Sequence, residues 1–134
     1  MPQSNLPTRS DSDLVASWRD VTSCYSSVRC ALDRELEEQH GLGMSEFEAL
    51  DRLAEAPDGA QRMQELGSAM YLSQSALSRV VARLERDGLV RRDMCAQDRR
   101  GIFVKLTDAG RERHRAARPT QLAVLAQHLE AGRS

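Results

Sequence analysis

The stretch from Ser73 to Gly88, SQSALSRVVARLERDG, carries the side chains whose types best suit recognition of a ligand. One side of it is polar and holds no acidic residue before Glu85. The polar residues on that side are Gln74, Ser75, Ser78, Arg79 and Arg83. Short hydroxyl and amide groups permit close approach to a DNA major groove, and a guanidinium can fork onto a guanine edge. We therefore predict that this stretch reads DNA; the alternative is an amphipathic helix with a solvated basic face.

These side chains share a face only if the stretch is helical. Its apolar residues recur with the 3.6-residue period of a helix; they are Leu77, Val80, Val81 and Leu84. Ser73 is placed to cap the first turn, and Leu72 can pack on Leu77 as a hydrophobic staple. Gly88 supplies the left-handed residue that commonly ends a helix.

Two shorter helices are predicted before this one. Ser45 and Glu48 have the spacing of a capping box, which would open a helix that ends at Pro57-Asp58-Gly59. Residues 61–70 predict a short helix, in which Gly67 would allow close approach to the next helix. Because so short a turn joins this helix to the 73–88 helix, the pair predicts a helix-turn-helix.

Extended segments follow directly. Residues 89–92 and 102–106 predict two strands, the second rich in β-branched and aromatic residues, joined by a polar loop over 93–101. A helix-turn-helix followed by a two-stranded hairpin is a winged helix. The predicted fold class is therefore mainly α, of the α+β kind: a winged helix-turn-helix with flanking dimerisation helices.

The flanking helices are predicted from their apolar periodicity. Between Leu14 and Leu36 apolar residues recur at steps of three or four, which predicts a long helix over about 13–39. Its stripe could be core or an oligomer seam, and we favour a subunit interface because the helix is longer than a small domain needs. After a cap at Thr107, two helices over 108–118 and 120–131 are predicted, broken by Pro119. The predicted interface residues are Leu14, Trp18, Val21, Leu122, Leu125 and Leu129.

The chain is therefore divided into four parts. We expect a disordered N-terminal tail over 1–12, a dimerisation helix over 13–40, the winged helix-turn-helix lobe over 41–106 and C-terminal dimerisation helices over 107–134. The first residues lack the apolar stretch of a signal peptide, and no apolar run approaches the length of a membrane span. We expect a cytoplasmic protein that has no membrane partner.

Charge is distributed unevenly along the 134 residues, whose net charge is −1. Residues 1–61 hold 5 basic and 12 acidic side chains, whereas residues 62–105 hold 9 basic and 5 acidic ones. The basic surplus begins with the predicted helix-turn-helix, as expected for a DNA binder with a local positive face. The three cysteines, Cys24, Cys30 and Cys95, do not have the spacing of a disulfide framework or a zinc site, and no cofactor is predicted.

Several motifs resemble the MarR family of bacterial transcriptional regulators, and the resemblance covers roughly residues 13–131. It rests on the run from Leu66 to Leu77, on LSRVVARLERDGLVRR over 77–92, on DRRG over 98–101 and on VKLTDAG over 104–110. These motifs occur together, in order and at family spacing. The resemblance implies a homodimer with two winged lobes, each of which places its recognition helix in the major groove of one half of a palindrome. The family's commoner action is repression.

The roles of individual residues follow from this arrangement and from their chemistry. In the major groove we expect Gln74, Ser75, Ser78 and Arg79 to face bases, with Gln74 facing bases or phosphate. We expect Arg62, Arg83 and the first-turn amides behind Ser73 to hold phosphates. For Arg62 and Arg83 the alternative is a solvated or salt-bridged surface arginine.

The wing is expected to reach the neighbouring minor groove. By matching position the resemblance implies Arg100 as the wing-tip arginine, with Arg99 as the nearest alternative. An arginine is favoured in a narrow, electronegative minor groove. Phosphate would repel a carboxylate on that surface, so Asp98 is expected to brace the wing by pairing with an arginine.

Many members of the family release DNA when a small aromatic molecule binds between the helical layer and the lobes. Trp18, Tyr25 and Phe47 could line such a cleft in this chain, and ordinary core is the alternative for each. Redox-sensing members use a cysteine of the first helix. Cys24 and Cys30 lie there but away from the sensor position, so we expect semi-buried apolar residues.

Metal-sensing members cluster histidines, whereas His40, His114 and His128 are scattered along this chain, and no metal site is predicted. Cys95 is expected in the exposed wing, and its role stays open.

Two other classes of function were weighed. An enzyme is not predicted, because the sequence shows no nucleophile triad, paired carboxylates, phosphate loop or metal spacing. A winged helix that binds protein should present an apolar anchor on its exposed side, and residues 73–83 offer none there.

Overall fold

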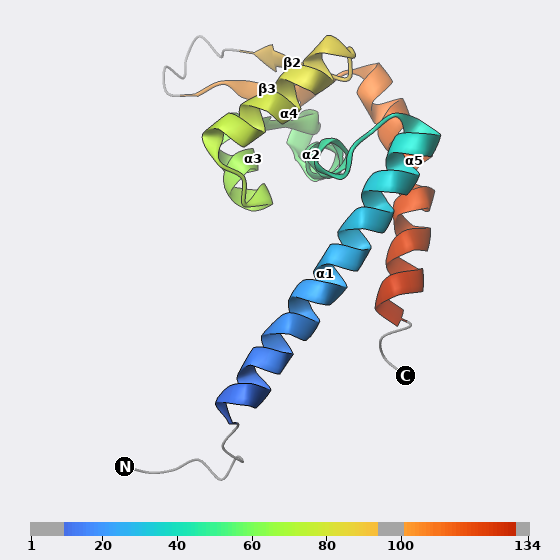
Figure 1. Ribbon diagram of the computed structural model, residues 1–134. Helices are drawn as coiled ribbons and strands as arrows, with labels where there is room; N and C mark the ends of the chain where they lie inside the picture. Colours follow the sequence, from blue (N-terminus) through green and yellow to red (C-terminus); the bar gives the residue numbers. More distant parts are fainter. Residues whose placement is uncertain (1–9, 94–100, 131–134) are drawn as a thin grey trace.

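The computed structural model describes residues 10–93 and 101–130 as a helical layer joined to a lobe with a small sheet (Figure 1). Its helices are α1 (Asp11–His40), α2 (Met44–Glu55), α3 (Met63–Met70), α4 (Gln74–Arg86) and α5 (Asp108–Leu125). Its strands are β1 (Ala60–Arg62), β2 (Val90–Asp93) and β3 (Phe103–Leu106). A short 3₁₀ turn, Pro57–Gly59, precedes β1, and a π-helical turn, Ala126–Glu130, follows α5.

The lobe is a winged helix-turn-helix, so the predicted fold class is confirmed. Its three-stranded antiparallel sheet has the order β1-β3-β2, with Val90 opposite Leu106 and Ala60 opposite Lys105. Strand β1 was not predicted: residues 61 and 62 were assigned to the helix that in fact begins at Met63. Three residues carry too little periodicity to indicate a strand, and their pairing partner lies more than forty positions along the chain.

One core joins the lobe to the helical layer. Leu36 of α1, Leu50 and Leu53 of α2, and Leu66 of α3 have no exposed surface, and the apolar face of α4 packs with them. The C-terminal part of α1 lies beside α5, whereas the N-terminal half of α1 projects away from the lobe (Figure 1). Among the helices of the described residues, none has the length and apolar character that crossing a membrane requires.

Three helix starts test the predicted caps. The hydroxyl oxygen of Ser73 accepts a hydrogen bond from the Ala76 amide at 3.2 Å, and that of Thr107 accepts one from the Gly110 amide at 3.0 Å, as predicted. Helix α1 begins at Asp11, two residues before its predicted start, because Ser10 caps it through the Asp13 amide. Two residues of the predicted disordered tail are therefore helical.

The predicted capping box of Ser45 and Glu48 is wrong. Helix α2 begins at Met44, where Glu46 accepts a hydrogen bond from the Gly43 amide at 2.7 Å. The Met44 amide donates to Asp33 of α1 at 2.8 Å. A carboxylate eleven positions earlier in the chain thus satisfies a free amide of α2, which allows the helix to begin earlier than its own sequence indicates.

Pro119 does not break the C-terminal helix, contrary to the prediction. Helix α5 continues through it to Leu125, so one helix with a final π-helical turn replaces two. Pro119 removes one amide donor, and the carbonyl four residues earlier belongs to Arg115. Both residues lie on exposed positions, where water can hydrate the carbonyl that loses its helical partner.

Candidate nucleic-acid interface

Helix α4 presents a polar outer face and buries an apolar one. Leu77, Val81 and Leu84 are buried, as the periodicity predicted, and Val80 is half-buried. All four predicted base-contacting residues are exposed; they are Gln74, Ser75, Ser78 and Arg79. The first turn contains no acidic residue. The helix therefore offers hydroxyl, amide and guanidinium groups outward, with no carboxylate near its N-terminal end.

The N-terminal end of α4 is also an electrostatic feature. The exposed Ser73 caps the helix through the Ala76 amide, and its hydroxyl oxygen lies 3.4 Å from that of Ser75. The other first-turn amides have no partner within a helix, and the macrodipole places positive potential there. A phosphate group would find favourable donors at this end of α4.

The turn between α3 and α4 holds the two helices at a close crossing. A Cβ atom added to Gly67 would lie 3.0 Å from Leu77 Cδ2, so the glycine permits the close helix approach that we predicted. Tyr71 ends α3 in the left-handed conformation, with φ of 58°, and its side chain is 94% exposed. Few non-glycine residues adopt this conformation.

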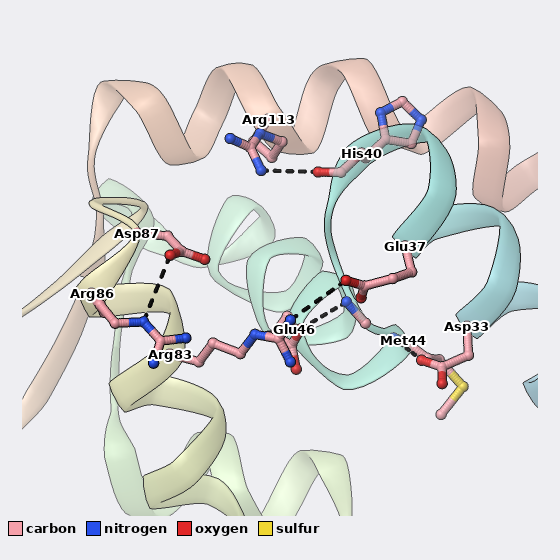
Figure 2. A network of polar contacts seen from close by, with 10 residues as sticks. Asp33, Glu37, His40, Met44, Glu46, Arg83, Arg86, Asp87 and Arg113 are labelled. Atoms are coloured by element: carbon pink, nitrogen blue, oxygen red, sulfur yellow. Dashed lines mark hydrogen bonds and ion pairs between the residues drawn. The ribbon is translucent and has the colours of Figure 1, made fainter.

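The two arginines that were predicted to hold phosphate lie in different surroundings. Arg62 lies in β1, half-buried, with its guanidinium carbon 5.6 Å from the centre of the Phe103 ring. Arg83 lies on the flank of α4 and forms ion pairs with Glu37 and Glu46 (Figure 2). The salt-bridged alternative for Arg83 therefore describes its state in this structure.

Arg86 is a candidate that the sequence reasoning missed. Residues 75, 79, 82 and 86 are spaced by four, three and four positions, which places them on one outward stripe of α4. The Arg86 side chain is 73% exposed and lies 3.9 Å from Asp87. The 3.6-residue period of the polar residues in this stretch is the sequence signal that indicates Arg86.

The predicted wing residues Asp98, Arg99 and Arg100, together with Cys95, lie outside the described residues. The strands that carry the wing are described and form the predicted hairpin. On β2, Arg91 is exposed and Arg92 pairs with Glu85 at 3.4 Å. The base of the hairpin is thus fixed to the end of α4.

Large apolar side chains remain exposed on the helical layer. Trp18 is 65% exposed and Tyr25 is 59% exposed, so neither belongs to the core of this chain. The other exposed members of the predicted interface are Leu14, Val21, Leu122 and Leu129, whereas Leu125 is half-buried. Cys24 and Cys30 are free and exposed on the same helix, not semi-buried as expected.

A pocket of about 290 Å³ lies between α1, α2, α5 and the end of α3. Phe47, Met70 and Leu125 contribute to its lining, with Arg52 as a charged group. Phe47 is otherwise a core residue, 2% exposed. Trp18 and Tyr25, which were grouped with Phe47 as cleft residues, do not line this pocket.

The three histidines have separate partners. His114 lies 2.7 Å from Asp51 and stacks on Phe47, His40 lies 2.7 Å from the Thr120 hydroxyl, and His128 lies 3.0 Å from the Val124 carbonyl. Over residues 10–93 and 101–130 there is no group of three side chains arranged to hold a metal ion.

Comparisons with known proteins agree with this geometry. The model of the MarR family matches residues 42–102. The structure of AbsC, a MarR family transcriptional regulator from Streptomyces coelicolor, is 32% identical with a TM-score of 0.83, covering 96% of this chain and 86% of that one. Sco3205 from the same organism, a MarR family transcriptional regulator solved in complex with DNA, is 33% identical with a TM-score of 0.84, covering 96% and 80%.

A curated relative matches over a shorter length. YkoM of Bacillus subtilis, an uncharacterized HTH-type transcriptional regulator, is 33% identical over 95 residues, which are 71% of this chain. The match spans 60% of the length of that relative. From the winged lobe, the exposed polar face of α4 and these similarities, the chain belongs to the MarR family of transcriptional regulators.

Proposed function

We propose that the protein is a homodimeric transcriptional regulator that binds a palindromic DNA operator and acts as a repressor. The observation that carries the proposal is the outer face of α4, which exposes Ser75, Ser78 and Arg79 beside a helix end without carboxylates. The solved complex of the similar Sco3205 with DNA supports it.

In this proposal the major groove receives the outer face of α4. Arg79 forks onto a guanine edge, and Gln74, Ser75 and Ser78 contact bases or phosphate nearby. Arg62 and the amide end of α4 behind Ser73 hold phosphates, which fix the position of the helix but read no sequence. In the wing, Arg100 or Arg99 enters the minor groove and Asp98 braces the loop.

The second subunit is proposed to cover the exposed apolar residues of the helical layer. Leu14, Trp18 and Val21 are exposed residues of the N-terminal half of α1. That half extends beyond the lobe (Figure 1). Leu122 of α5 and Leu129 of the π-helical turn after it are also exposed. Exposed apolar surface of this extent marks an interaction site more often than a solvated surface. Two subunits would present two recognition helices to two half-sites.

A small aromatic effector is proposed to bind the pocket beside Phe47. Its volume, about 290 Å³, is just below the roughly 300 Å³ at which the usual range for ligand sites begins, which suits a single ring with small substituents. The pocket lies between the helical layer and the helix-turn-helix, with Met70 and Tyr71 from the turn that leads into α4. A ligand there would contact both parts and could change the angle between them.

The proposal is tested by gel retardation with DNA from upstream of the protein's own gene, in a titration of salt. We expect footprinting to show a protected palindrome with half-sites about 10 base pairs apart. The logarithm of the affinity should fall linearly with the logarithm of salt concentration. If folded protein showed no preference for any duplex over random DNA, operator recognition would be excluded and a protein partner would become the better explanation.

A further inference from the structure

The guanidinium of Arg83 lies between two carboxylates that come from two other helices (Figure 2). Its Nη2 atom is 3.5 Å from Glu37 Oε1 of α1, and its Nε atom is 3.7 Å from Glu46 Oε1 of α2. One side chain of the recognition helix therefore contacts both helices that precede the helix-turn-helix. Among the described residues, Arg79 and Arg86 of the outward stripe form no ion pair with another helix. Arg86 lies 3.9 Å from Asp87, at the end of α4 itself.

Glu46 is a fixed partner for Arg83. Its carboxylate accepts a hydrogen bond from the Gly43 amide at 2.7 Å, and its side chain is 12% exposed. Two exposed charged side chains lose conformational freedom when they pair, which offsets much of the attraction. A carboxylate that is already held by the helix it caps has lost that freedom beforehand, so Arg83 has a partner at a defined position.

The corner that carries Glu46 is tied to the helical layer. The Met44 amide donates to Asp33 of α1 at 2.8 Å, and the Arg113 guanidinium of α5 donates to the His40 carbonyl at 2.9 Å (Figure 2). Residues 40–46 are thus held by hydrogen bonds from both long helices. Through this corner, Arg83 connects α4 to the part of the molecule that we propose to dimerise.

We propose that Arg83 is a positioning residue that sets the angle of the recognition helix against the helical layer. In a dimer this angle determines the separation of the two recognition helices, and hence the half-site spacing that binds best. The inference rests on the proposed function, because it requires a dimer on a palindrome. It replaces our expectation that Arg83 holds a phosphate, which would require the guanidinium to leave both carboxylates.

Loss of the Arg83 contacts should loosen this angle without unfolding the lobe. Val81 and Leu84 of α4 are buried in the core and keep the helix docked. A dimer whose recognition helices are less constrained loses more affinity for an operator with the correct half-site spacing than for operators with other spacings. Only the correct spacing benefits from a preset helix angle. The salt dependence stays the same, since no phosphate contact is removed.

The test compares Arg83→Ala and Glu46→Gln with the wild-type chain. The probe is a palindromic duplex selected by the wild-type chain from random sequences, with versions whose spacer is one base pair shorter or longer. The side-chain oxygen of glutamine can still accept the hydrogen bond from the Gly43 amide, so Glu46→Gln keeps the helix cap and loses the charge. We expect both variants to bind the selected spacing about fivefold more weakly, the upper range for a partly exposed ion pair. Binding to the altered spacings and the salt slope should match the wild type.

Glu48→Gln is the matched control, because Glu48 lies on the same helix but pairs with Arg52 within α2, at 2.8 Å. It should keep the wild-type spacing preference. The proposal is overturned if Arg83→Ala lowers the salt slope by about 0.9 per half-site, as loss of a phosphate contact does, while Glu46→Gln leaves binding unchanged or tighter. If the wild-type chain selects no duplex, the proposed function itself fails; if it selects a palindrome and both variants keep its spacing preference, only the role of Arg83 fails.

Discussion

At the scale of single residues, the arginines of α4 divide into two groups by what surrounds them. Arg79 and Arg86 lie on the outward stripe, whereas Arg83 lies on the flank and meets Glu37 and Glu46. The residue types alone do not separate these groups, because all three arginines lie within the same helical stretch. Their separation depends on which carboxylates the neighbouring helices bring within reach.

Replacing Arg79 with alanine should weaken operator binding by about 1–3 kcal/mol per half-site and reduce the preference for the operator over single-base variants of it. The physical reason is the loss of a bidentate contact to a base edge. Gel retardation with the operator and its variants measures both effects. Arg19→Ala is the control, because Arg19 is exposed in the N-terminal half of α1, which projects away from the lobe (Figure 1). An Arg79→Ala variant with wild-type affinity and preference would contradict the assignment of α4 as the recognition helix.

At the scale of elements, two glycines allow helices to approach their neighbours. Gly67 lies at the α3–α4 crossing, and Gly110 lies in the first turn of α5 against the backbone of Leu89. A Cβ atom at Gly110 would run into the Leu89 carbonyl oxygen, whereas the only tight contact of one at Gly67 would be with the end of the Leu77 side chain. The glycine that ends the VKLTDAG motif is therefore explained by packing of α5 on Leu89, the residue before β2.

Gly110→Ala should destabilise the protein more than Gly67→Ala. We expect Gly67→Ala to cost less than about 2 kcal/mol, because the roughly 1 kcal/mol that alanine gains over glycine inside a helix offsets part of the overpacking, and we expect a larger loss for Gly110→Ala, because backbone atoms must move. Urea unfolding measures the free energy of each variant at one protein concentration. Gly88→Ala is a useful comparison, since a Cβ atom there meets nothing within 4 Å and only its φ of 75° opposes the change. Equal losses for Gly67 and Gly110 would argue against the backbone contact.

Pro119→Ala should stabilise the chain, because α5 already runs through this position and alanine restores an amide donor. The gain should be about 1–3 kcal/mol, at or below the usual difference between proline and alanine inside a helix. Urea unfolding at fixed protein concentration measures it. Ala123→Pro, at an exposed position of the same helix, should have the opposite effect. A loss of stability in Pro119→Ala would show that contacts of the proline ring outweigh the missing hydrogen bond.

At the scale of the whole molecule, the core of the lobe is buried within one chain, whereas several large apolar residues of the helical layer are exposed. The apolar stripe of α1 is buried at Leu32 and Leu36, beside α5, and exposed at Trp18, Val21 and Tyr25. The periodicity is continuous along the helix, so the change from buried to exposed marks where the partners in this chain end. A second copy is the partner that we propose for the exposed half.

Trp18→Glu should therefore convert the dimer to a monomer and reduce affinity for the palindrome at least about tenfold, because the second half-site no longer contributes. Sedimentation equilibrium gives the oligomeric state, and gel retardation gives the affinity. Ser23→Glu adds the same charge on the opposite side of α1, where the chain is also exposed, and should leave both unchanged. A Trp18→Glu variant that remained dimeric would place the interface elsewhere.

The sequence by itself determined the elements that local pattern specifies. The apolar period of α4 and its cap at Ser73 involve residues within a few positions of one another, so the local sequence is enough to predict them. The crossing of α3 and α4 and the hairpin of β2 and β3 join residues ten or more positions apart, but each segment carries its own pattern and a single connection joins each pair. Tertiary structure alone decided the features that need a partner on another element that no local pattern indicates: β1 exists because β3 pairs with it, and α2 begins at Met44 because Asp33 of α1 accepts a hydrogen bond from the Met44 amide. It also decided that Arg83 meets Glu37 and Glu46, because a local pattern gives the face on which a side chain lies but not the charge that the fold brings opposite it.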